Sequence, residues 1–346
     1  MSSFVKPVTC APEPSATAIA AGAAAAIAAA VAAAIAFPIE ARAAEAAQET
    51  PASMVGALHS AFGSHPARAV HAKGTILQGS YTPTAQAREL SAAALFASGT
   101  IPVTVRFSDF TGLPDIPDTA GEANPRGLAL KFRVPTDGEV DLVTHSFNGF
   151  PTRTSDEFAQ LLRAVGASGG DAAKPTELDR FLDAHPVAKT FLTTQKPAPV
   201  SYATLSYYGV NAFAFIDAHG QRHLVRYRFV PKAGEQTLDA AALRERGPSY
   251  LQQEIAARVA AAPIAFDWYA QIGEPGDVAD DPSLAWPESR RLVKLGSVTI
   301  TRLDSDARTD KALLYLPGRM PPGIEAVDPM IAMRNAAYPI SFAERQ

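Results

Sequence analysis

Cysteine is nearly absent from this chain of 346 residues, which contains only Cys10. A single cysteine excludes an internal disulfide and a cysteine-rich metal site. Basic runs are also missing, and the formal net charge is -4 at pH 7, so nothing in the charge pattern favours nucleic acid as a partner. Any redox chemistry must therefore come from a bound cofactor.

Charge is missing from one further segment, residues 17–37, which consists mostly of alanine after a short polar start that contains Lys6. Ala41 and Ala43 have the spacing of a signal-peptidase site. The segment is long enough to span a bilayer, although alanine is only weakly hydrophobic. We expect residues 1–43 to be a cleaved signal peptide of a periplasmic or otherwise exported protein. An uncleaved membrane anchor and a cytoplasmic linker segment are the alternatives.

Residues 44–346 show no internal repeat and no long linker, so we expect one domain. The α+β class is predicted because strand patterns dominate and helical patterns are clustered between them. The predicted helices are 51–62, 156–165, 178–192 with a break near Pro186, 239–246 and 249–260, and a short helix ends the chain. The predicted strands are 75–79, 101–107, 128–134, 203–208, 211–216, 223–230, 266–271 and 292–301.

Five short motifs follow one another along this domain, and each alone is ordinary. They are Arg68 to Gly74, Val105 to Ser108, Asn124 to Phe132, Asp141 to Val143, and Arg334 to Tyr338, with Arg345 seven residues further on. In this order they resemble the haem catalase superfamily, and the length resembles its short, peroxidase-like branch. The resemblance implies an antiparallel eight-stranded β-barrel surrounded by helices, and a haem cofactor, with haem b as the expected type.

The last motif is suited to hold the iron. A free tyrosine loses its proton only near pH ~10, so a phenolate ligand needs a positive neighbour. Arg334 and Tyr338 are four residues apart, which on a helix places them on one face. The resemblance implies that Tyr338 is the axial ligand of the haem iron and that Arg345 lies near a haem propionate.

The first two motifs supply the opposite side of the haem. Peroxide cleavage needs a group that accepts a proton and returns it, and a histidine is suited to both steps. The resemblance implies this role for His71, an orienting role for Ser108, and propionate contacts for Arg68 and Arg106. Five other histidines are expected to be surface or structural residues: His59, His65, His185, His219 and His223.

One position departs from the family pattern. Full catalases have a second distal residue, an asparagine, shortly after the Asp-Leu-Val motif. An ungapped count places Ser146 there, and Asn148 would reach the pocket only if the loop were shifted by two. The chain also lacks the long wrapping and carboxy-terminal regions of full catalases. Both departures favour peroxidase activity over dismutation of peroxide.

The sequence thus predicts a haem-dependent peroxidase that reduces hydrogen peroxide or organic peroxides with small organic electron donors. A low-efficiency catalase and a non-enzymatic haem-binding module are the alternatives. Rearrangement of fatty-acid hydroperoxides is disfavoured, because enzymes of that kind carry threonine where this chain has Val70. Membrane contact is expected only through an uncleaved amino-terminal segment. A homo-oligomer is compatible with the sequence, which leaves the donor and the oligomeric state open.

Overall fold

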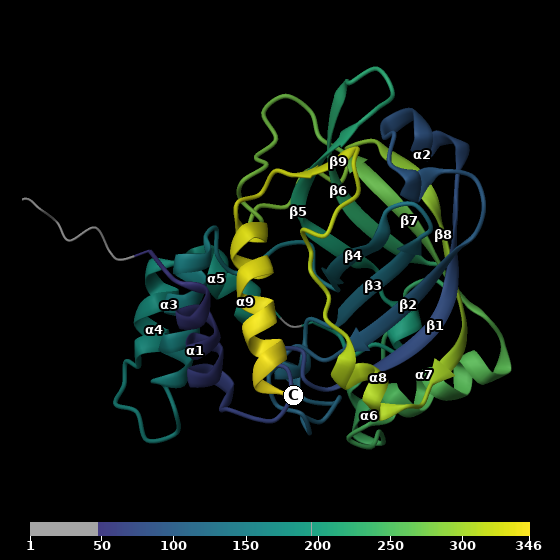
Figure 1. Cartoon of the computed structure of the whole chain (residues 1–346). Helices are drawn as coiled ribbons and strands as arrows, with labels where there is room; N and C mark the ends of the chain where they lie inside the picture. Colours follow the sequence, from purple (N-terminus) through teal and green to yellow (C-terminus); the bar gives the residue numbers. More distant parts are fainter. Residues whose placement is uncertain (1–47, 195) are drawn as a thin grey trace, which may run out of the picture. The chain divides into compact units, whose positions relative to one another are not determined.

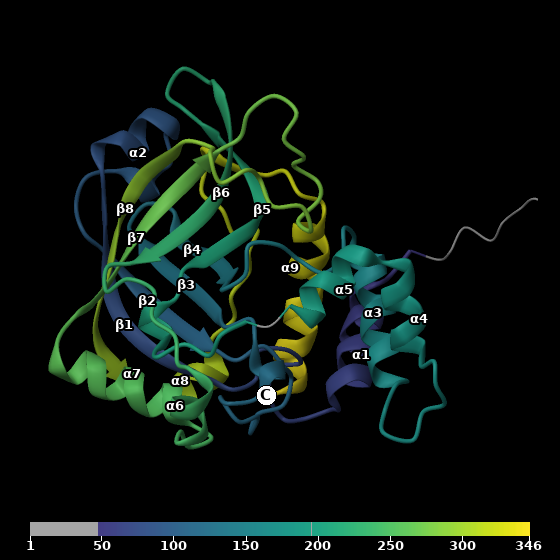
Figure 2. The ribbon, with the colours of Figure 1, turned by 180° about the vertical axis from the view of Figure 1, so that it is seen from behind.

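Within the described residues, eight antiparallel strands close into a barrel (Figures 1 and 2). Neighbouring strands follow the order β4-β3-β2-β1-β8-β7-β6-β5, and the barrel closes where His145 of β4 pairs with Tyr208 of β5. A short strand, β9 (Ile324–Ala326), extends the sheet beyond β5. The barrel strands are β1 (Gly74–Pro83), β2 (Ile101–Ser108), β3 (Gly127–Val134), β4 (Gly138–His145), β5 (Tyr207–Ile216), β6 (Arg222–Pro231), β7 (Ile264–Ile272) and β8 (Leu292–Asp304).

This computed structural model describes residues 48–194 and 196–346. Residues 49–346 form one compact unit, and the α+β class and the eight-stranded barrel are confirmed. Cys10 and the predicted signal or anchor segment, residues 1–43, lie outside the described residues. In the part of the chain that is described, no helix has the length and apolarity needed to cross a membrane.

Aromatic rings fill the barrel interior. Trp268 is fully buried and stacks on Phe132 and Phe229, with ring centroids 5.7 and 5.5 Å apart. Phe107 stacks in the same way on Tyr202 at 5.3 Å. The interior is therefore a packed hydrophobic core, as expected for a barrel of eight strands.

The helix α9 (Met330–Glu344) lies between the barrel and a group of helices made of α1, α3, α4 and α5 (Figures 1 and 2). Apolar side chains of α1, α3 and α9 form one buried cluster that includes Val55, Leu58, Leu162 and Ala337. This packing holds α9 against α1 and α3, while Ile331 of α9 belongs to the core cluster of the barrel. The other helices are α1 (Pro51–Phe62), α2 (Ala85–Leu90), α3 (Ser155–Gly166), α4 (Glu177–Ala184), α5 (Pro186–Thr193), α6 (Ala240–Arg244), α7 (Tyr250–Ala261) and α8 (Ala307–Ala312).

Most predicted elements are confirmed, including α1 and the break at Pro186 that separates α4 from α5. The predicted strand 203–208 is wrong over its first residues, where Ser201 caps a short 3₁₀ turn, Tyr202–Thr204. The final helix is longer than expected, at 15 residues. Strand β4 was not predicted, because an aspartate such as the buried Asp141 is unusual in a strand. Lys131 Nζ donates to this carboxylate at 2.7 Å.

Candidate active site

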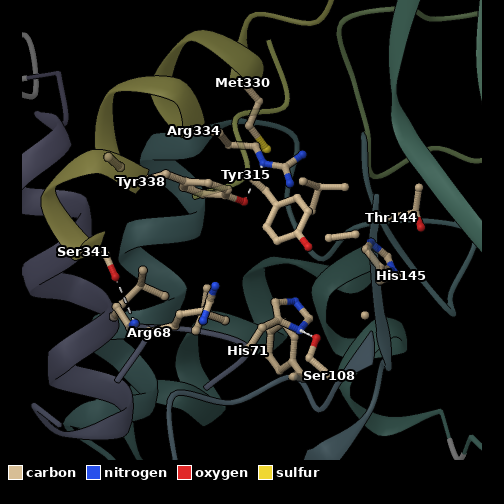
Figure 3. A pocket seen from close by; sticks show the side chains of 18 of the residues that line it. Arg68, His71, Ser108, Thr144, His145, Tyr315, Met330, Arg334, Tyr338 and Ser341 are labelled. Carbon is tan, nitrogen blue, oxygen red and sulfur yellow. Dashed lines mark hydrogen bonds between the residues drawn. The ribbon is translucent and has the colours of Figure 1, made fainter. Parts of the chain in front are cut away.

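A cavity of about 190 Å³ opens between α9 and the barrel (Figure 3). One flank is apolar and comes from the helices that pack beside α9. The seven side chains that the sequence predicts for the site all line this cavity: Arg68, His71, Arg106, Ser108, Arg334, Tyr338 and Arg345. Residues from both ends of the domain are therefore brought together at one place.

On the α9 side, Arg334 donates from Nε to Tyr338 Oη at 3.0 Å, one helical turn away. The same guanidinium donates to Asn211 Oδ1 at 2.6 Å, and Asn211 Nδ2 donates to the buried Asp328 at 2.7 Å. Asp328 also accepts from the backbone N–H of Met330 at the start of α9. Sequence reasoning missed Asn211 and Asp328, which orient Arg334 toward the phenol oxygen.

On the barrel side, His71 Nδ1 lies 3.0 Å from Ser108 Oγ. The backbone of His71 is in the left-handed region, with φ of 57°, a conformation that is uncommon for a residue other than glycine. Its N–H donates to the carbonyl of Phe110 at 2.8 Å, and its carbonyl accepts from Arg106 at 2.9 Å. The Phe110 ring and the imidazole lie at right angles with centroids 5.5 Å apart, so Ser108 and Phe110 both contact the imidazole.

Two motif glycines make room for these side chains. A Cβ at Gly127 would lie 2.4 Å from Ser108 Oγ and 2.8 Å from His71 Nδ1. A Cβ at Gly74 would lie 2.5 Å from the guanidinium carbon of Arg106. Any side chain at either position would therefore displace a site residue. Both glycines belong to the predicted motifs, but the sequence alone gives them no role.

The imidazole of His71 is kept neutral. Burial and the neighbouring Arg106 cation lower its pKa to about 3, with smaller contributions from Arg334 and Arg68 in the same direction. At physiological pH the ring can therefore accept a proton, and it returns that proton readily because the charged form is disfavoured.

Three arginines gather at another part of the cavity wall. Arg68 and Arg106 both form ion pairs with Asp310 at 2.8 Å, and Arg345 donates to the carbonyl of Leu313 at 2.7 Å. Burial and then the Arg106 charge lower the pKa of Arg68 to about 9, and burial lowers that of Arg345 to about 10. Three cations and one carboxylate leave a charge of +2 in this arginine cluster, so it lacks anions.

The distal position after the Asp-Leu-Val motif needs a correction. Ser146 Oγ accepts from the backbone N–H of Arg126 at 2.8 Å, and Asn148 bonds to Glu288 at an exposed site. Of residues 144–148, Thr144 and His145 line the cavity, and Ser146 and Asn148 do not. Side chains alternate along β4, so Val143 and His145 share a face, and Ser146 lies beyond the end of the strand. The ungapped count, which assigned the asparagine's place to Ser146, therefore does not lead to a residue of the cavity.

A family model described as catalase matches residues 59–345. The chain belongs to the catalase family. It is therefore a haem oxidoreductase that acts on peroxide. Among the residues that the structure describes, no group of three or more histidine, cysteine or acidic side chains could hold a metal ion directly.

Two curated relatives are similar over most of this catalase-family chain. A catalase-related peroxidase of Synechococcus elongatus is 33% identical over 86% of the chain and 88% of the relative. A catalase-related peroxidase of Mycolicibacterium paratuberculosis is 36% identical over 86% and 95%. A solved fungal catalase shares the fold with a TM-score of 0.72 at 22% identity, covering 82% of this chain. The chain spans about three-fifths of the length of that catalase, 59%.

The residues of this catalase-family cavity fit a haem. The two propionates of a haem carry a charge of −2, and the arginine cluster has the matching charge of +2. Arg345 Nε and Tyr315 Oη are buried, and neither has a hydrogen-bond partner within residues 48–194 and 196–346. Buried polar atoms of this kind are usually satisfied by a ligand or water. Tyr338 presents its phenol oxygen beside Arg334, and a tyrosine oxygen is one of the axial ligands that haem iron takes in proteins.

Proposed function

We propose that this protein is a haem-dependent peroxidase that reduces hydrogen peroxide or organic peroxides with organic electron donors and releases little oxygen. The observation that carries the proposal is that two hydrogen-bonded pairs of side chains, Arg334–Tyr338 and His71–Ser108, border one cavity. In this proposal haem b is held through its iron by Tyr338 and through its propionates by Arg68, Arg106 and Arg345.

When bound, haem supplies the electron transfer to peroxide, and the protein supplies the proton transfer. In the tautomer that donates Nδ1–H to Ser108, His71 leaves Nε2 free to accept the proton of one peroxide oxygen. The same nitrogen then returns the proton to the other oxygen as the oxygen–oxygen bond breaks. Ser108 acts through His71, because its hydrogen bond fixes the ring and the tautomer.

The apolar flank of the cavity supports organic donors or organic peroxides as substrates. Met54 and Val55 of α1, Phe158 of α3 and Phe191 of α5 line it. Val70, next to His71, also lines the cavity, and an apolar side chain there argues against hydroperoxide rearrangement. The name catalase-related peroxidase, which both curated relatives carry, favours the same conclusion.

The test is a comparison of two products from one haem-loaded preparation. Hydrogen peroxide is added with and without an aromatic amine or phenol, and the oxygen released and the donor oxidised are measured at matched haem content. We expect donor oxidation to exceed oxygen release. The reverse ratio would instead support a low-efficiency catalase. A haem spectrum that does not change within seconds of adding peroxide would support a non-enzymatic haem-binding module.

We also propose that residues 1–43 export the protein or anchor it in the membrane, with residues 44–346 as the enzyme domain. The observation behind this proposal is the uncharged, alanine-rich run of residues 17–37 followed by Ala41 and Ala43. Expression of the full chain, cell fractionation and the mass of the mature protein test it. A cytoplasmic protein of full length would contradict both versions.

A further inference from the structure

Asp310 is the carboxylate of the arginine cluster. It belongs to α8, and its side chain forms ion pairs with Arg68 Nη1 and Arg106 Nε, both at 2.8 Å. Its backbone carbonyl also accepts from Arg68 Nη2 at 3.0 Å. Arg68, Arg106 and Arg345 line the cavity, whereas Asp310 does not. The aspartate therefore lies behind the arginines and does not occupy the place that a ligand in the cavity would take.

The guanidinium of Arg106 is held in one orientation by bonds on two sides. Asp310 accepts from its Nε at 2.8 Å and from its Nη2 at 3.2 Å. On the other side Nη1 donates to the carbonyl of His71 at 2.9 Å, and Nη2 donates to that of Ala72 at 3.1 Å. A guanidinium has five N–H groups, so these four bonds leave one N–H, on Nη1. The carboxylate thus orients the guanidinium without saturating it.

The carboxylate of Asp310 stays ionised at physiological pH. Burial favours its neutral form, but the neighbouring Arg106 and Arg68 cations outweigh burial and hold its pKa below the usual range. The arginines in turn need this charge, because burial, Arg106 and Arg345 all act to lower the pKa of Arg68. Buried cations that lack a counter-ion are unfavourable. Without Asp310 the arginine side chains would therefore turn toward solvent and away from the cavity.

We propose that Asp310 is a positioning residue for the cofactor, which holds Arg68 and Arg106 toward the cavity so that the haem propionates meet guanidinium groups that are already oriented. The inference rests on the proposed function, which assigns the propionates to these arginines. Asp310 does not touch the haem in this role and acts only through the two side chains. An oriented site loses less side-chain freedom on binding, so it retains its ligand longer.

The test measures how fast haem b leaves the loaded protein when apomyoglobin is present in excess as a haem acceptor. Asp310→Asn keeps the size of the side chain and removes its charge, whereas Asp310→Glu keeps the charge. We expect haem loss from the Asn variant to be about tenfold faster than from the wild type, the effect of losing a hydrogen bond between charged groups. The Glu variant should recover most of this difference.

Asp306→Asn is the matched control. Asp306 caps the same helix, and its side chain pairs with the exposed Arg308. Asparagine caps a helix about as well as aspartate does, so this change removes a charge from α8 without touching the arginine cluster. Haem loss from the control should stay within about twofold of the wild type.

Haem b dimethyl ester separates positioning from a general loss of stability. Both propionates are esterified in this probe, so it offers no anion to the arginines. The ester should leave the wild type and the Asp310→Asn variant at rates within about twofold of each other. Equal acceleration of the loss of haem b and of its ester would mean that Asp310 only stabilises the fold, and it would overturn the proposal.

Three other results would also overturn it. Slower loss of haem b from the Asp310→Asn variant would show that the carboxylate competes with the propionates for the arginines. An unchanged rate would show that the arginines are oriented without it. An Asn variant that no longer folds, while Asp306→Asn does, would assign Asp310 to the stability of the fold.

The two proposals can fail separately. A wild-type protein that loses haem b and its dimethyl ester equally fast contradicts the propionate contacts of the proposed function. A wild-type protein that retains haem b much longer than the ester, together with an Asp310→Asn variant of unchanged haem loss, contradicts only the role of Asp310.

Discussion

The α9 wall of the cavity presents a cation, Arg334, 3.0 Å from the phenol oxygen of Tyr338, whereas the barrel wall presents two histidines whose pKa values are lowered to about 3. Charge is thus kept where an anion must be stabilised, and it is suppressed where a proton must be accepted and returned. The two walls also differ in construction. A single helix turn places the first pair, while His71 and His145 come from segments 74 residues apart in the sequence.

Among changes that test this difference between the two walls, removing the oxygen of Tyr338 should have the largest effect. Tyr338→Phe should abolish stable ferric haem binding or convert its spectrum, because the α9 wall then has no anionic oxygen to offer the iron. Haem content and the charge-transfer spectrum of the purified variant are the measurements. Full haem content with an unchanged spectrum would mean that another residue ligates the iron.

On the barrel wall, His71→Ala should keep haem but lose peroxidase turnover by roughly 10² to 10⁴, the usual effect of losing a general acid–base group. Haem should remain because the residue is not a ligand in this assignment. Turnover per haem is measured at saturating donor. Near wild-type turnover would assign the proton transfer elsewhere, with His145 as the next candidate to test.

A change behind Arg334 should have a smaller effect. Asn211→Leu removes the side-chain donor to the buried Asp328 and the acceptor of Arg334 Nη1, which should lower the free energy of unfolding by about 1–3 kcal/mol. The haem spectrum should also shift, because Arg334 is no longer fixed against Tyr338. Denaturant unfolding and absorption spectra check both effects. Asn148→Ala, which removes only an exposed bond, should change neither.

The neutral histidines predict how stability depends on pH. In the unfolded chain a histidine takes up its proton near pH ~6.5, but His71 and His145 stay neutral in the folded protein until about pH 3. The unfolded state therefore binds more protons below pH ~6.5, so each histidine lowers the free energy of unfolding by about 1.4 kcal/mol per pH unit as pH falls toward about 3. Above that window the two residues contribute no pH dependence.

Urea unfolding at several pH values can resolve one of these two contributions. His145→Gln lacks one titrating ring, so its stability should fall less steeply between pH 6 and pH 4 than that of the wild type. Equal slopes in the two proteins would show that His145 is protonated in the folded state and that the barrel wall is not neutral.

The smallest effect is expected at Ser146. Its hydroxyl faces the backbone of Arg126 and not the cavity, so Ser146→Asn should change the ratio of oxygen released to donor oxidised by less than about twofold. A clear rise in that ratio would restore the ungapped reading of the Asp-Leu-Val motif.

The sequence could predict the parts of the site that depend on local order. Arg334 and Tyr338 could be paired because helix geometry fixes residues four apart. The α+β class followed from the strand patterns, and the barrel was implied by the family resemblance of the ordered motifs. Asn211 could not be found, because it meets Arg334 only after β5 and α9 pack together across more than a hundred residues. His145 was missed for a similar reason: its direction depends on where β4 ends, and one residue of error reverses the face.

The roles of Gly127 and Gly74 were also beyond the sequence. A glycine in a motif indicates a special backbone or a close approach, but it does not say which side chain needs the space. Only the positions of Ser108, His71 and Arg106 show that side-chain volume, and not backbone conformation, decides these two residues.

The left-handed backbone of His71 has a consequence for protein engineering. Such a conformation costs a residue with a side chain on the order of 1 kcal/mol, and glycine adopts it freely. A laboratory selection that scores thermal stability alone should therefore enrich glycine at position 71. This change relieves the backbone strain, but it also removes the imidazole that the proposed proton transfer needs. Libraries made to stabilise this enzyme need an activity screen in every round, or position 71 held constant.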